Sequence, residues 1–96
     1  MEKITIVAQA RAKPGMEERM VAAQIALVEA TRGSAGCLRY ELHRSLQDPS
    51  QVMFVEEWAS YEAWHAHMRS ERIRQFQRTG GAAIGDFQLY EMRQVA

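Results

Sequence analysis

Residues 37–58 read CLRYELHRSLQDPSQVMFVEEW, and this stretch decides the fold. Apolar and polar residues alternate in its first part, 37 to about 45, and in its last part, 51–58, as is typical of strands. Between them Asp48 precedes Pro49, which is the order that a type I turn favours. Two strands joined so closely are expected to form an antiparallel hairpin.

Toward the N-terminus, residues from about 3 to 12 alternate with a period of two and predict another strand. The segment 13–15, Lys-Pro-Gly, ends it. A helix is expected from 16 to about 32, stopped by Gly33. Its apolar residues at helical spacing are Met20, Ala23, Leu27 and Ala30.

Toward the C-terminus, Ser60 and Ser70 each stand where a helix cap belongs. We expect short helices over 61–68 and 71 to about 78, and a last strand over 87–92. The order of elements predicts one α+β domain spanning 1–96, a ferredoxin-like split βαβ fold with a four-stranded antiparallel sheet and helices on one face.

Composition excludes several classes of function. The 96 residues are 47% hydrophobic, and 12 basic residues balance 12 acidic ones. A zero net charge argues against nucleic-acid and membrane-surface partners. The start of the chain does not resemble a signal peptide, so a cytoplasmic location is expected. The lone cysteine, Cys37, has no disulfide partner and is interpreted as a buried strand residue.

The predicted sheet has apolar side chains on both faces, although helices cover only one. The residues opposite the predicted helix-facing set are Val7, Met53, Val55, Tyr90 and Met92. A solvated face is normally polar. We therefore expect a homodimer in which two sheets pack against each other.

Glu56 is the unusual residue of strand 51–58, because a period of two places it between Phe54 and Trp58 on one face. Burial there raises the pKa of a carboxyl group unless a cation pairs with it. The alternatives are a structural ion pair with an arginine and a catalytic or ligand-orienting role.

The segment 61–70 carries Trp64 and two histidines, His65 and His67. Side chains two residues apart on a helix diverge, so the two imidazoles cannot hold one metal ion, and no metal site is expected. Whichever histidine faces the sheet is either a proton-transfer group or a structural hydrogen-bonding group.

Two further residues are candidates for contact with a substrate. Arg72, just after Ser70, is placed to hold an anion at the mouth of a pocket, unless it belongs to a solvated helix face. Tyr40 either reaches the pocket with its hydroxyl group or is a core aromatic residue.

The order and spacing of several segments resemble the antibiotic biosynthesis monooxygenase superfamily, in particular its quinol monooxygenase-like branch. The segments lie within about 13–76: Lys13-Pro14-Gly15, Gly36 to Arg44, Asp48-Pro49, Glu56-Glu57-Trp58 and Ala66 to Ser70. The resemblance implies a dimeric α/β-barrel. The superfamily includes cofactor-independent oxygenases of quinol-like aromatics, haem-degrading enzymes and an isomerase.

Departures from these subgroups refine the expectation. Phe54 occupies the place of an Asn in oxygenases acting on polyketide quinols, and Gln77 falls near the place of the haem-ligating His, so haem is not expected. Where many quinol-oxygenase-like members have Ser-Pro-His, this chain has Ser70-Glu71-Arg72.

The resulting hypothesis is a cofactor-independent monooxygenase acting on a small quinol-like or phenolic aromatic with O2. His67 is the base or a hydrogen-bond partner, Arg72 and Tyr40 stabilise the substrate anion, and Glu56 orients His67 or Arg72. Trp58, Phe54 and Trp64 form the aromatic contacts. The alternatives are a non-oxidative isomerase of a small carbonyl compound and a small-ligand-binding dimer without catalysis.

Overall fold

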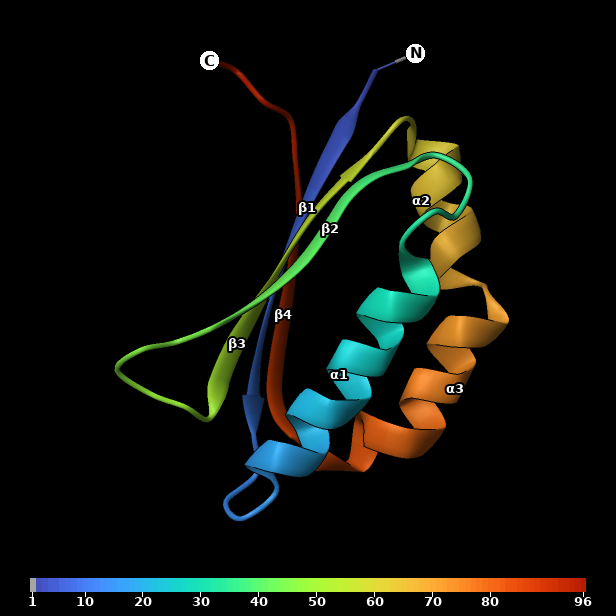
Figure 1. Ribbon diagram of the computed structural model, residues 1–96. Coiled ribbons are helices and arrows are strands. Elements are labelled where there is room, and N and C mark those ends of the chain that lie inside the picture. The colour runs from blue at the N-terminus through green and yellow to red at the C-terminus, as the bar shows by residue number, and fades with distance from the viewer. Residues whose placement is uncertain (1) are drawn as a thin grey trace.

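The computed structural model describes residues 2–96, which form a four-stranded antiparallel sheet with its helices on one side (Figure 1). The strands are β1 (Ile4–Ala12), β2 (Cys37–Arg44), β3 (Gln51–Trp58) and β4 (Ile84–Met92), in the order β2-β3-β1-β4. The helices are α1 (Glu17–Thr31), α2 (Tyr61–Met68) and α3 (Glu71–Gly80), followed by a 3-10 turn, Gly81–Ala83. The predicted α+β ferredoxin-like fold is confirmed.

Strand register decides which side chains face the helices. In β1, Ile6 pairs with Glu56 of β3, and Ala8 pairs with Phe54 of β3 and Leu89 of β4. Paired residues point to the same side of a sheet, so Glu56 lies on the helix-covered face. The small side chain of Ala8 in the central strand leaves space beneath the helices.

The starts of α2 and α3 match the predicted caps. The Ser60 hydroxyl accepts a hydrogen bond from the backbone N–H of Ala63 at 3.1 Å, and the Ser70 hydroxyl accepts one from Ile73 at 3.4 Å. Gly36, with φ of +77°, lets the chain before β2 approach α2, because a Cβ atom there would lie 2.5 Å from the Cβ of Ala63.

Three local expectations are corrected. Strand β4 begins at Ile84 rather than at 87. In α1 the buried face includes the polar residues Gln24 and Thr31, while Ala30 is exposed. A register shift between Cys37 and Arg39 interrupts the alternation at the start of β2, so Cys37 is half-buried rather than buried.

The sheet face away from the helices is apolar in one part and charged in another. Tyr90 and Met92 of β4 are 44% and 51% exposed, and Val7 and Val55 beside them are half-buried. Along β2 the same face is charged: Arg39 bonds Glu41 at 3.1 Å. The expectation of an apolar second face therefore holds around Val7, Val55, Tyr90 and Met92, whereas β2 and Glu57 of β3 make the same face charged elsewhere.

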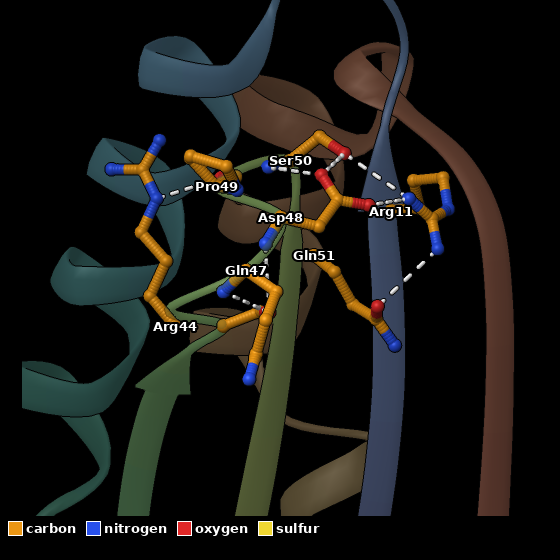
Figure 2. A network of polar contacts seen from close by, with 8 residues as sticks. Arg11, Arg44, Gln47, Asp48, Pro49, Ser50 and Gln51 are labelled. Atoms are coloured by element: carbon orange, nitrogen blue, oxygen red, sulfur yellow. Dashed lines mark hydrogen bonds and ion pairs between the residues drawn. The ribbon is translucent and has the colours of Figure 1, made fainter.

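The predicted turn between β2 and β3 is held by side chains (Figure 2). Arg11 of β1 pairs with Asp48 and donates to Gln51 at 3.3 Å. Asp48 in turn accepts from the Ser50 hydroxyl at 2.6 Å, and Arg44 donates to the backbone carbonyl of Pro49 at 2.7 Å. The network ties the end of the hairpin to β1.

Within residues 2–96, no helix is long and apolar enough to cross a membrane.

Candidate functional site

A cavity of about 230 Å³ lies between the sheet and the helices α1 and α3. Most of its lining is apolar, and four polar side chains also reach it: Tyr40, Glu56, His67 and Gln77. The apolar lining includes Ala8, Leu27, Phe54, Met68, Ile73, Phe76, Ile84, Phe87 and Leu89. A second hollow of about 310 Å³, beside Ile25 and Arg32 at the surface, is lined by no buried titratable side chain.

Glu56 is the acidic group of the cavity. Its side chain is only 5% exposed and accepts a hydrogen bond from the indole N–H of Trp58 at 2.9 Å. Burial raises the pKa of Glu56 from 4.5 to about 7, against the smaller lowering effect of that hydrogen bond. Among residues 2–96 no cation pairs with it at salt-bridge distance. Within the described residues Glu56 therefore forms no ion pair with an arginine, and no hydrogen bond joins it to His67 or Arg72.

Of the two histidines, His67 faces the cavity. It is 1% exposed, and its Nε2 lies 3.3 Å from the Tyr40 hydroxyl. Burial, and then the nearby charge of Arg72, lowers the pKa of His67 from 6.5 to about 4, so the ring is neutral at pH 7. His65 points the other way, with its ring 4.2 Å from that of Tyr61 between centroids.

Arg72 lies behind His67 rather than at the mouth of the cavity. Its Nε donates to Nδ1 of His67 at 3.1 Å, and its Nη2 donates to the hydroxyl of Ser34 at 3.3 Å. Arg72 is absent from the side chains that line the cavity. Its donors are directed to protein groups, and direct contact of Arg72 with a substrate anion stays a prediction.

The predicted aromatic contacts divide into two groups. Phe54 and Tyr40 line the cavity, with ring centroids 5.6 Å apart. Trp58 is fully buried against His67, 4.7 Å between centroids, and does not line the cavity. Trp64 packs in α2 against Tyr61 and also lies outside it. Direct substrate contact by either tryptophan stays a prediction, and Phe54 and Tyr40 are the predicted aromatic contacts that line the cavity.

Two lining residues of α3, Ile73 and Phe76, were not singled out as site residues. They are three positions apart and therefore share a helix face, which is the signal that could have identified them. Within residues 2–96, no group of three or more His, Cys, Asp or Glu side chains is placed to hold a metal ion.

Among curated proteins, the human protein N-terminal EF-hand calcium-binding protein 1 is 31% identical over 67 residues. The match covers 67% of this chain and 19% of that protein, and the protein of the same name from Pongo abelii matches equally. The chain thus spans about a fifth of the length of the curated relatives it matches.

Solved structures of similar fold cover nearly the whole chain. PA3566 from Pseudomonas aeruginosa is 28% identical with a TM-score of 0.93, covering 100% of this chain and 97% of that one. SO0527 from Shewanella oneidensis is 32% identical with a TM-score of 0.90, covering 97% and 91%. A structure described as an antibiotic biosynthesis monooxygenase is 28% identical with a TM-score of 0.89, covering 97% and 99%.

The family model described as antibiotic biosynthesis monooxygenase matches residues 3–79, which include β1 to β3 and all but the last residue of α3. This segment supplies Tyr40, Glu56 and His67 to the cavity. The chain therefore belongs to the antibiotic biosynthesis monooxygenase family.

Proposed function

We propose that this protein is a cofactor-independent monooxygenase that uses O2 to oxidise a small neutral phenolic or quinol-like aromatic, with Glu56 as the base. The observation that carries the proposal is a 5% exposed carboxyl group with a pKa of about 7 inside an apolar cavity. A base with a pKa near the working pH is suited to proton transfer. Family membership supports the reaction class.

The structure favours Glu56 over His67 as the base. The Nδ1 lone pair of His67 already accepts from Arg72, and the low pKa of the ring opposes proton uptake. Within residues 2–96 Glu56 forms no competing ion pair, and its raised pKa is closer to the pKa of a phenol than that of an ordinary carboxyl group. His67 is then a hydrogen-bonding partner of Tyr40, the second of the two roles expected for it.

The proposed reaction balances without a cofactor. Glu56 takes the proton of the substrate hydroxyl group, and the resulting anion delivers electrons to O2. One oxygen atom becomes a new carbonyl oxygen at a ring carbon that carried one hydrogen, and the other oxygen atom leaves as water with that hydrogen and the hydroxyl proton taken up by Glu56. The substrate supplies all four electrons, so no external reductant is consumed.

Cavity size and charge support the proposed substrate class. An apolar protein cavity of about 150 Å³ is sufficient for benzene, whereas this one has about 230 Å³. One substituted ring or two small fused rings suit that space. No lysine or arginine of the described chain lines it. A substrate that enters neutral and is ionised inside fits better than one carrying a carboxylate or phosphate.

The working form is proposed to be a homodimer formed through the helix-free face of the sheet. Val7, Val55, Tyr90 and Met92 would be covered by a second copy, which removes exposed apolar surface from water. Light scattering should then give twice the chain mass, and Val55→Arg should reduce it to that of one chain. A wild-type mass equal to a single chain would contradict this assembly.

The test of the reaction is oxygen uptake with naphthol and naphthohydroquinone as probes, corrected for uptake without protein. Glu56→Gln should lower turnover by about 10²- to 10⁴-fold. The matched control is Glu62→Gln, which changes an exposed carboxyl of α2 outside the cavity and outside the proposed dimer face and should leave turnover unchanged.

Other results would contradict the proposed function. Turnover of a probe without oxygen would indicate a non-oxidative isomerase. Stabilisation by the probes without any turnover would indicate a ligand-binding dimer. Equal losses in the two Gln variants would remove Glu56 as the base.

A further inference from the structure

The three polar residues behind and beside the cavity form a hydrogen-bond chain whose direction is determined by Arg72. A guanidinium group is always charged and only donates hydrogen bonds. Since Nε of Arg72 points at Nδ1 of His67 at 3.1 Å, that nitrogen must carry a lone pair and no hydrogen. A neutral imidazole has one hydrogen, which in His67 is therefore on Nε2.

The second link joins His67 to Tyr40. Nε2 of His67 lies 3.3 Å from the hydroxyl oxygen of Tyr40. With the hydrogen on Nε2, the Tyr40 oxygen is the acceptor in this contact. The phenol hydrogen of Tyr40 is then left to bind another acceptor.

Tyr40 reaches the cavity together with Glu56. Within the described residues the Tyr40 hydroxyl has no hydrogen-bond partner besides His67, and the neighbouring Thr31 hydroxyl donates to the backbone carbonyl of Leu27 at 2.7 Å. Burial raises the pKa of Tyr40 above its usual range, which keeps the phenol protonated. The hydroxyl group is therefore a permanent donor at the wall of the cavity.

We propose that Tyr40 donates a hydrogen bond to the ionised oxygen of the bound substrate, and that Arg72 is a positioning residue that directs this donor through His67. The proposal rests on the proposed function in that the cavity takes a phenol. The charge of Arg72 polarises the imidazole, and the imidazole polarises the phenol, because hydrogen bonds in series strengthen one another. Arg72 thus stabilises an anion that it does not touch.

The local structure keeps this chain in place. The Ser70 hydroxyl donates to the backbone carbonyl of His67 at 2.6 Å and also caps α3, where Arg72 is the second residue. Ser34, before β2, accepts from the other end of the guanidinium group. Both partners of the contact between Arg72 and His67 are therefore fixed by the junction of α2 and α3.

The test measures the pKa of a bound nitrophenol, whose anion is coloured and whose ionisation needs no oxygen. The titration is done in a Glu56→Gln background, so that the carboxyl group of the cavity does not titrate together with the ligand. Tyr40→Phe and Arg72→Gln should each raise the pKa of the bound nitrophenol by about one unit, a tenfold loss in acid dissociation constant. Arg69→Gln, an exposed arginine of the same junction, is the control and should change nothing.

The double variant decides whether Arg72 acts through Tyr40. If it does, Tyr40→Phe with Arg72→Gln should shift the pKa no further than Tyr40→Phe alone. Additive shifts, no shift in Tyr40→Phe, or failure of nitrophenol to bind in the cavity would each overturn the proposal.

A second measurement needs neither ligand nor turnover. The ¹⁵N shifts of His67 should show hydrogen on Nε2 and none on Nδ1 in the wild-type protein, and a mixture of tautomers in Arg72→Gln. Hydrogen on Nδ1 in the wild type would overturn the proposal. Neither readout involves oxygen uptake. The hydrogen-bond proposal can therefore fail while the monooxygenase function stands, and the monooxygenase function can fail while the hydrogen-bond proposal stands.

Discussion

Glu56 and Glu57 are neighbours in β3 and face opposite sides of the sheet. Glu56 is buried beneath the helices, and no cation of the described chain pairs with it at salt-bridge distance. Glu57 is bonded by Lys3 at 3.3 Å and by Arg39 at 3.5 Å on the open face. The difference teaches that the side of the sheet, rather than residue type, decides whether a carboxyl group is an ordinary surface charge or a candidate base.

The largest effect is expected when the buried carboxyl group is removed by Glu56→Gln. The folded-state pKa of about 7 exceeds the ordinary value of 4.5, so between these pH values the folded chain holds a proton that the unfolded chain has released. The resulting stabilisation is fully present below pH 4.5 and is lost as the pH rises through 7. It amounts to about 3 kcal/mol at about 1.4 kcal/mol per pKa unit.

Urea unfolding at fixed protein concentration should therefore find Glu56→Gln more stable than wild type by about 3 kcal/mol near pH 8, and equal to it near pH 4. A difference that is the same at both pH values would show that the carboxyl group is not held neutral by burial.

His67→Gln tests a second buried group on the same face, whose contribution to the unfolding free energy changes with pH in the opposite direction. The folded-state pKa of His67 is about 4, below the ordinary 6.5, so its stabilisation is present above 6.5 and is lost as the pH falls through 4. After allowance for solvent screening we expect this stabilisation of the folded state to be about 2 kcal/mol. As the pH falls, the wild-type chain loses stability through His67 and gains stability through Glu56. The two changes largely cancel, so we expect an unfolding free energy that is nearly constant between these pH values.

Each single variant should reveal the other group: Glu56→Gln becomes less stable as the pH falls from 7 to 4, and His67→Gln becomes more stable. Unfolding curves across this range provide the check. Parallel pH profiles in both variants would contradict the opposed titrations.

Gln24→Met sharpens the comparison by making the buried face more apolar. Both polar atoms of the Gln24 amide are buried without a hydrogen-bond partner in the described structure, and the side chain is fully buried. Replacing it with a chain of similar shape should raise the free energy of unfolding by about 1–2 kcal/mol. Gln75→Met, at an exposed position of α3, should change it by less than about 0.5 kcal/mol. A loss of stability in Gln24→Met would mean that the amide has a partner.

Glu57→Gln is expected to have the smallest effect. Its ion pairs with Lys3 and Arg39 are on the open face, where such pairs contribute less than about 1 kcal/mol. The loss in unfolding free energy should shrink further as salt is added. A loss as large as 3 kcal/mol would remove the contrast between the two faces.

The fold was readable from local signals because each is physical and short in range. The period of two in β3 placed Phe54, Glu56 and Trp58 on one face, and the structure buries all three. The serine caps located the starts of α2 and α3. The bulge at Cys37 and the early start of β4 escaped prediction, because pairing with a neighbouring strand decides them.

For the candidate site, the sequence was sufficient to name Glu56, His67, Arg72 and Tyr40, because their side chains suit proton transfer and the stabilisation of an anion. It could not assign their partners. Glu56 and Trp58 bond along one strand, whereas Arg72 contacts His67 across the junction of two helices. The two tryptophans looked like substrate contacts, yet packing places both away from the cavity.

By itself the sequence determined the order of the elements, the strand faces and the helix caps, because these depend on residues within a few positions of one another. Only the tertiary structure decided that no cation of the described residues pairs with Glu56, that Arg72 lies behind His67, and that a cavity opens over Ala8. Those outcomes depend on distances between segments far apart in the chain, which residue spacing alone does not contain.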